Sequence, residues 1–120
     1  LAQFDTIKKI ANDGPCVIVG RCADYALSDY DNVLNLFIYG DINKRIERVM
    51  KKYNVSEKDA KDMILKKDKQ RASYYNYYST KKWGKAETYS LCVDSTVLGR
   101  DGTVELLCQF VNDYEQRIQA

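Results

Sequence analysis

The sequence has no histidine, one proline and four cysteines among its 120 residues. Without histidine, the chain lacks the most common general base of enzymes and one of the usual zinc ligands. No two cysteines have the Cys-x-x-Cys spacing of common zinc sites. Three of the four lie in apolar runs, where a free thiol behaves as a small hydrophobic side chain. We therefore predict reduced cysteines and no metal site.

Long apolar runs are also missing. None approaches the roughly 20 residues that span a bilayer, and no signal-peptide pattern is present. These absences predict a cytoplasmic protein that does not enter a membrane. The length predicts a single domain over residues 1–120. The sequence opens on Leu1 rather than methionine, inside a predicted helix, which leaves truncation, processing and a trivial cause open.

Charge is distributed unevenly along the chain. Between Ile42 and Lys85 there are 14 Lys or Arg and 5 Asp or Glu, although the net charge of the whole chain is only +2. The rest of the chain is therefore acidic. A basic segment in an acidic body favours an anionic partner, whereas the alternative is a pair of helices with lysine-rich faces in solvent.

Apolar spacing predicts alternating helices and strands. Helices are expected over residues 1–13, 42–53 and 57–78, and along a stripe formed by Val104, Leu107, Cys108, Val111 and Ile118. Asp41 and Ser56 are expected to cap the second and third helices. Strands are expected at residues 16–19, 33–39 and 90–94. This order predicts an α/β fold with a parallel sheet. The connection over residues 20–32 is short for a parallel crossover, so the first two strands are not expected to be neighbours.

The predicted strand ends carry polar residues at the edge where open α/β sheets bind ligands. These residues are Gly20, Arg21 and Asp24 after the first strand, Gly40 and Asp41 after the second, and Asp94, Ser95 and Thr96 at the third. Helical spacing also pairs Arg45 with Arg48 and Asp68 with Arg71. Arginines from several elements could clamp a phosphoryl group. The alternatives are a structural ion pair for Arg21 and surface positions for the other pairs.

Aromatic and basic residues alternate in the last part of the third helix and just after it. They are Tyr74, Tyr75, Tyr77, Tyr78 and Trp83, among Lys69, Arg71, Lys81, Lys82 and Lys85. Such interleaving can indicate base stacking on single-stranded nucleic acid. The alternative is that Tyr74, Tyr75 and Tyr78 pack their helix against the core.

Four stretches together resemble the bacterial cytidylate-kinase-like family. They are the strand and Gly-Arg turn at residues 16–24, the Lys-Arg-Ile-Glu-Arg helix at 44–48, the Asp-Lys-Gln-Arg-Ala-Ser-Tyr-Tyr run at 68–75 with Lys-Lys-Trp-Gly at 81–84, and Val-Asp-Ser-Thr at 93–96. The resemblance covers essentially the whole chain. Its most specific part is the third stretch, because a Gly-Arg turn alone is common.

The resemblance implies a P-loop nucleoside-monophosphate kinase fold, with a three-layer parallel sheet, flanking helices and a helical lid over residues 42–85. It implies transfer of the γ-phosphoryl of ATP, with Mg²⁺, to a nucleoside monophosphate such as CMP. Arg45, Arg48 and Arg71 would then be catalytic, the first two acting from the lid. Arg21, Asp24 and Asp68 would bind substrate, and Asp68 would orient Arg71. Such transfers depend on positioning and charge neutralisation.

Two features depart from that family. Cytidylate kinases have Asp directly after Gly-Arg, where this chain has Cys22, and this leaves the acceptor open. No G-x-x-x-x-G-K-[ST] phosphate loop occurs, so the ATP-binding residues are unknown and the chain alone is expected to be inactive. In the family, that loop and two strands precede the stretches present here, and one of those strands separates the first two predicted above. We expect a longer parent protein, or another chain, to complete the sheet.

Two other function classes stay open on the sequence. One is a nucleotide-binding or regulatory module without catalysis, and the other is a basic RNA- or single-strand-binding domain. The leading interpretation expects a small nucleotide as partner, neither nucleic acid nor membrane, and leaves a homo-oligomer open.

Overall fold

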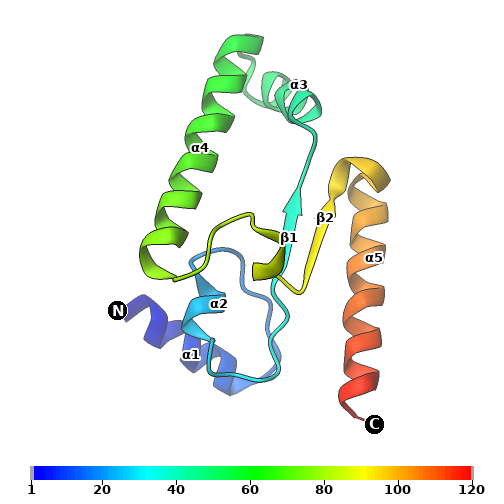
Figure 1. Cartoon of the computed structure of the whole chain (residues 1–120). Coiled ribbons are helices and arrows are strands. Elements are labelled where there is room, and N and C mark those ends of the chain that lie inside the picture. Colours follow the sequence, from blue (N-terminus) through cyan, green and yellow to red (C-terminus); the bar gives the residue numbers. More distant parts are fainter. Residues whose placement is uncertain (1, 120) are drawn as a thin grey trace. The chain divides into compact units, whose positions relative to one another are not determined.

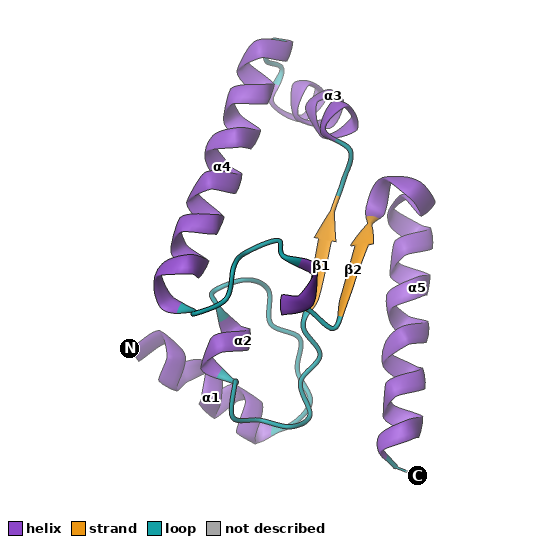
Figure 2. Ribbon diagram, viewed as in Figure 1, coloured by secondary structure: helices purple, strands orange, loops and turns teal. Residues whose placement is uncertain are grey.

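The structure is a computed structural model that describes residues 2–119. Its elements are α1 (Ala2–Asp13), α2 (Ala23–Ala26), β1 (Leu36–Tyr39), α3 (Ile42–Tyr53), α4 (Glu57–Tyr78), a short 3-10 helix η1 (Ala86–Thr88), β2 (Leu91–Asp94) and α5 (Ser95–Ile118) (Figure 1). β1 and β2 pair side by side and run parallel (Figure 2). This part of the chain is therefore α/β, mostly helical, with a two-stranded parallel sheet. Within it, no helix is both long and apolar enough to cross a membrane.

The described residues form two compact units, each assembled from two separate stretches of chain. Unit 1 contains residues 2–36 and 63–91, and unit 2 contains residues 37–62 and 92–119. Helix α4 begins in unit 2 and continues into unit 1. Each unit is described below by itself.

The predicted strand at residues 16–19 is wrong, because these residues form no regular secondary structure. Val17 and Val19 are 93% and 88% exposed, whereas Ile18 between them packs against the core of unit 1. A strand needs a partner for its backbone groups, and the sheet of the described residues holds only β1 and β2. The expectation that this segment does not pair with the next predicted strand is confirmed.

Local sequence signals predicted the helices well. The ends of α3 at Ile42 and Tyr53 agree with the prediction, and α4 ends at Tyr78 as expected. Asp41 caps α3, since its Oδ2 accepts the N–H of Lys44 at 3.1 Å. Ser56 caps α4, since its Oγ accepts the N–H of Asp59 at 3.1 Å.

The strands were predicted less well than the helices. β2 agrees closely with the expected strand, whereas β1 begins only at Leu36. The N–H of Ser90 donates to the carbonyl of Asn35 at 2.7 Å, immediately before both strands. The pairing with β2, which starts at Leu91, therefore sets the length of β1 more than the apolar run does.

The core of unit 1 joins α1, α2 and the C-terminal part of α4. Its buried hydrophobic residues are Phe4, Ile7, Cys22, Ala26, Leu27 and Tyr75. The ring of Phe4 contacts Tyr25 and Tyr78 edge to face, with centroids 5.7 and 5.5 Å apart. Tyr74 and Tyr78 also pack against this core, so the packing interpretation of Tyr74, Tyr75 and Tyr78 is confirmed. Trp83 packs there as well.

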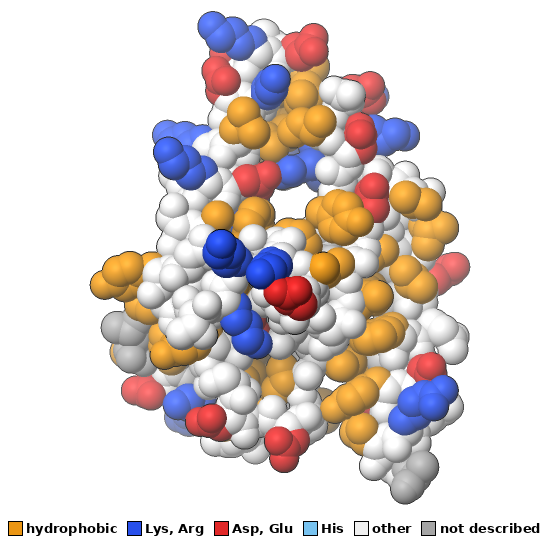
Figure 3. Space-filling model, in the orientation of Figure 1, with side chains coloured by type: hydrophobic (Ala, Val, Ile, Leu, Met, Phe, Trp, Pro, Cys, Tyr) orange, Lys and Arg blue, Asp and Glu red, His pale blue; other side chains and the backbone are white. Residues whose placement is uncertain are grey.

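Unit 2 buries little, even though it contains the longest helix. Ile46 and Ala60 are buried, but Val104 and Ile118 of the predicted α5 stripe are more than half exposed. Figure 3 shows hydrophobic side chains on the surface along α5. Gly99 interrupts this helix with a φ of +74°, just after its first turn, and Thr103 Oγ1 donates to the Gly99 carbonyl at 2.6 Å. The stripe is thus helical as predicted but only partly covered.

Candidate functional site

A left-handed turn presents Arg21 at the surface of unit 1. Gly20, Arg21 and Cys22 have φ values of 69°, 61° and 57° in succession. Glycine adopts this conformation freely, but for the other two it costs about 1–2 kcal/mol each. Cys22 is buried, and its Sγ donates to the carbonyl of Tyr75 at 3.9 Å, while the N–H of Ala23 donates to Gly20 at 3.3 Å. Strained backbone of this kind often marks a functional position.

The thiol of Cys22 is structural rather than reactive. Burial, followed by the nearby Asp24 carboxylate, raises the pKa of Cys22 to about 11. A nucleophilic cysteine needs its thiolate, which a raised pKa disfavours at neutral pH. Cys22 therefore fills space beneath the turn.

Asp24 lies at the start of α2 and is fixed through both of its oxygens. Oδ1 accepts the N–H of Tyr25 at 2.9 Å, and Oδ2 accepts the hydroxyl of Tyr75 at 2.5 Å. A carboxylate has about four lone-pair positions, so roughly two remain for other donors. Asp24 also lines a small cavity of about 130 Å³, together with Tyr25, Ser28, Ser79, Thr80 and Lys81.

Tyr75 is buried at 6% exposure, and its hydroxyl donates to Asp24. Burial and the hydrogen bond to Asp24 both raise the pKa of Tyr75 above its ordinary value, and a hydrogen bond from Ser79 opposes them. The hydroxyl therefore stays protonated at physiological pH and donates to the carboxylate.

Arg71 and Asp68 form the expected pair on α4. Nη1 of Arg71 donates to Oδ1 of Asp68 at 2.9 Å, and the Arg71 side chain is 57% exposed. Tyr75 lies one helical turn after Arg71. Because Tyr75 bonds to Asp24, the helix that carries Asp68 and Arg71 also fixes Asp24. Unit 1 therefore contains four of the six candidate residues: Arg21, Asp24, Asp68 and Arg71.

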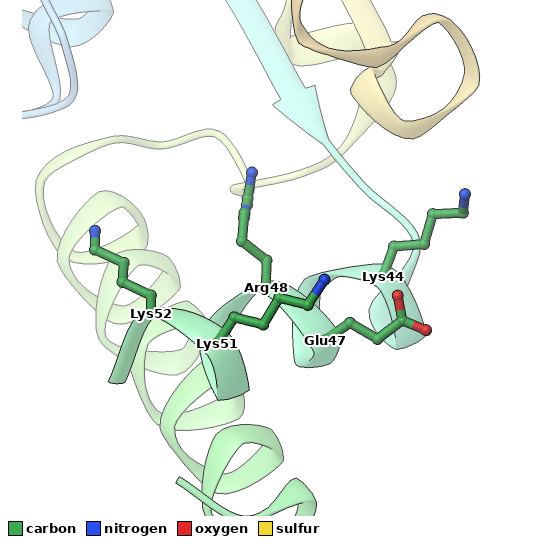
Figure 4. Close-up of a pocket in the computed structure, with 5 residues that line it drawn as sticks. All are labelled: Lys44, Glu47, Arg48, Lys51 and Lys52. Atoms are coloured by element: carbon green, nitrogen blue, oxygen red, sulfur yellow. The ribbon is translucent and has the colours of Figure 1, made fainter. Parts of the chain in front are cut away.

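Arg45 and Arg48 lie on α3 in unit 2 and have different surroundings. Arg48 lines an open hollow of about 460 Å³ with Lys44, Glu47, Lys51 and Lys52, and these side chains diverge from the helix (Figure 4). Arg45 is half-buried, with its Cγ 3.6 Å from the position of a Cβ added at Gly40. The gathering of all four arginines around one anion stays a prediction.

The carboxyl ends of β1 and β2 are tied together by hydroxyl groups. Ser95 Oγ donates to the Tyr39 carbonyl at 3.1 Å, and the N–H of Asp41 donates to Thr96 Oγ1 at 3.4 Å. Asp94 accepts from the N–H and the hydroxyl of Thr96, and these bonds, followed by Lys44, lower the pKa of Asp94. The strand exits thus form a fixed polar edge, where open α/β sheets bind ligands.

The sequence did not predict the hydroxyl contact of Tyr75 or the bridging role of Thr96. Spacing did place Tyr75 one turn after Arg71, but its partner Asp24 is 51 positions away and has no local signal. Among residues 2–119, no group of three or more His, Cys, Asp or Glu side chains is arranged to hold a metal ion.

Comparison with known proteins gives the family. A model of the cytidylate kinase-like family matches residues 1–97. A crystal structure of an uncharacterized protein from Eubacterium ventriosum is similar, at 37% identity and a TM-score of 0.83 over 92% of this chain. The present chain covers 63% of that protein. No curated protein matches. The family model spans both the strained Gly-Arg turn and the Asp68–Arg71 pair, and the chain belongs to the cytidylate kinase-like family.

Proposed function

We propose that this chain carries the acceptor-binding part of a phosphotransferase that transfers the γ-phosphoryl of ATP to a nucleoside monophosphate such as CMP. Family membership supports the kinase relation. The observation that carries the proposal is within unit 1. There, the strained turn that presents Arg21 is anchored through Tyr75 to the helix that presents Arg71.

Each arginine has a role in this proposal. Arg21 contacts the acceptor nucleotide, and Arg71, oriented by Asp68, binds the phosphate that is transferred or accepted. Guanidinium groups suit this task because they stay charged and can bind two phosphate oxygens at once. Arg45 and Arg48 close over the phosphates from α3 as part of the lid. Asp24 offers its remaining lone pairs to hydrogen-bond donors of the nucleotide.

The donor side lies outside the described residues in this proposal. When bound, ATP would supply the phosphoryl group, and Mg²⁺ would neutralise the negative charge that builds up around it. No glycine-rich phosphate loop occurs in the 120 residues, and the described carboxylates form no metal cluster, so these residues do not fit the donor. We therefore assign ATP binding to a further segment or another chain, which would also complete a P-loop-type sheet.

Isothermal titration of the chain with CMP tests the acceptor site. We expect CMP to bind and a non-hydrolysable ATP analogue to bind far more weakly. Arg71→Ala should weaken CMP binding about tenfold or more, since hydrogen bonds to charged groups contribute about 1.5–3 kcal/mol. Arg100→Ala, an exposed arginine on α5, is the matched control and should leave the affinity unchanged. Equal effects of the two variants would refute the acceptor assignment.

One observation favours a second candidate function, the binding of single-stranded nucleic acid. Tyr77 is 81% exposed and precedes Lys81 and Lys82, which suits a ring that stacks on an unpaired base. Titration with a single-stranded oligonucleotide at increasing salt separates the two functions. Tight binding that weakens steeply with salt and is insensitive to Arg71→Ala would favour nucleic-acid binding. A CMP affinity far above that for oligonucleotides favours the nucleotide acceptor.

A further inference from the structure

We propose that Tyr75 is a positioning residue, whose hydroxyl holds Asp24 in the orientation that binds the acceptor nucleotide. This inference rests on the proposed function, since it assigns a role to a residue behind that site. Tyr75 itself is buried and would not contact the nucleotide.

The hydroxyl has a role beyond packing. The ring of Tyr75 belongs to the apolar core of unit 1, and a phenylalanine ring would fill the same space. A buried hydroxyl is unfavourable unless it is hydrogen-bonded, and here its acceptor is the Oδ2 of Asp24 at 2.5 Å. The raised pKa of Tyr75 keeps that proton on the tyrosine. The hydroxyl is thus a permanent donor aimed at one carboxylate oxygen.

Asp24 gains a fixed orientation from two donors on different elements. The N–H of Tyr25 holds Oδ1 locally, and Tyr75 holds Oδ2 from α4. With only the local donor, the carboxylate could turn between rotamers, because the terminal torsion of aspartate is broad. The carboxylate remains partly exposed beside the 130 Å³ cavity, where Lys81 also lies. A cavity of about 150 Å³ holds a benzene molecule, so this one suits a single ring-sized group of a ligand.

Tyr75 also contacts two parts of the site. Its carbonyl accepts from Cys22 in the strained turn, and its hydroxyl bonds to Asp24 beyond that turn. Arg71 lies one turn earlier on the same rigid helix. A residue at this point sets the register between the turn that carries Arg21 and the helix that carries Arg71. A nucleotide that contacts both would bind without first having to order them.

A double-mutant cycle on the 120-residue chain tests this role, with CMP as the probe. Tyr75→Phe removes only the hydroxyl, and Asp24→Ala removes its partner. We expect each to weaken CMP binding about tenfold, and the double variant to bind no more weakly than Asp24→Ala alone. Tyr74→Phe is the matched control on the same helix, because its hydroxyl bonds instead to Gln3 at 3.0 Å. It should leave the affinity unchanged.

The possible outcomes distinguish the positioning role of Tyr75 from the proposed acceptor-binding function. Absence of CMP binding by the wild-type chain would refute the proposed function, and this inference with it. Binding by the wild-type chain with unchanged affinity in Tyr75→Phe, or additive losses in the double variant, would refute the positioning role alone. Carbon-13 NMR of the wild-type chain adds a test that does not depend on any variant folding. CMP should shift the ring Cζ of Tyr75 together with the carboxyl carbon of Asp24, and a Tyr75 signal that stays in place would contradict the proposal.

Discussion

Arg71 donates a hydrogen bond to Asp68 at 2.9 Å, one turn earlier on α4. In the proposed site this pair has a function, because Asp68 orients the guanidinium of Arg71 that binds the phosphate. Its contribution to folding should nevertheless be small. Ion pairs three residues apart on a helix contribute about 0.2–0.5 kcal/mol.

Asp68→Ala should therefore separate binding from stability. We expect CMP affinity to fall about threefold to tenfold, and the free energy of unfolding to change by less than about 0.5 kcal/mol. Calorimetric titration and urea unfolding measure the two quantities. Asp113→Ala is the control, since it breaks a similar pair with Arg117 on α5 at 3.2 Å. Equal losses of CMP affinity in both variants would contradict a specific role for Asp68.

Arg21→Gly should weaken CMP binding and raise the free energy of unfolding. Glycine adopts the left-handed backbone at φ 61° without strain, so we expect the variant to be more stable by roughly 0.5–1 kcal/mol. Loss of the guanidinium should weaken CMP binding about tenfold or more. Asn54→Gly, at another left-handed position with φ 52°, should stabilise the chain less and leave CMP affinity intact. An Arg21→Gly variant that binds CMP as tightly as the wild-type chain would exclude Arg21 from the site.

The stability of the chain should decline in alkaline solution because of Cys22. Between pH 9 and about 11 the unfolded chain has lost this proton while the folded chain retains it, so unfolding becomes more favourable as pH rises. The stabilisation is complete below pH 9 and is lost by about pH 11. After allowance for solvent screening it amounts to about 1 kcal/mol.

Urea unfolding between pH 8 and 11 measures this loss. The slope against pH should be shallower in Cys22→Ala than in the wild-type chain. Cys108→Ala, which removes an exposed thiol outside unit 1, is the control. The raised pKa of Tyr75 contributes in the same direction in every variant, so the difference between variants isolates the thiol. Identical slopes in all three proteins would exclude Cys22 as the cause.

Ser56→Ala should destabilise the chain by about 1 kcal/mol, since it removes the cap of α4. Ser73→Ala, at an exposed position inside the same helix, should be neutral or slightly stabilising because alanine is the better helix former. Thermal unfolding followed by circular dichroism compares the two variants. A larger effect at Ser73 would show that the cap contributes little.

The helices could be predicted because their signals are local. Asp41 and Ser56 each bond to a backbone N–H three residues later, so the same short stretch of sequence that encodes the cap also shows it. The strands depend on partners elsewhere in the chain. Residues 16–19 have a strand-like composition, yet no strand pairs with them among the described residues.

The candidate site divides in the same way. Helical spacing was enough to pair Asp68 with Arg71, and the family resemblance was enough to select Arg21 and Asp24. Neither could show that Tyr75 connects the two parts, because the bond to Asp24 forms only once α2 and α4 pack together. Contacts that depend on tertiary packing leave no periodic trace in the sequence.

The interleaved units have a consequence for synthesis on the ribosome. All of unit 1 has emerged from the ribosome once residue 91 is translated. Residues 37–62 have emerged by then too, but the rest of their unit, from residue 92 onward, is translated later. These residues include most of strand β1 and the cationic helix α3. In the nascent chain, residues 37–62 therefore stay unfolded between the two stretches of unit 1. This segment is the one that we expect chaperones to bind.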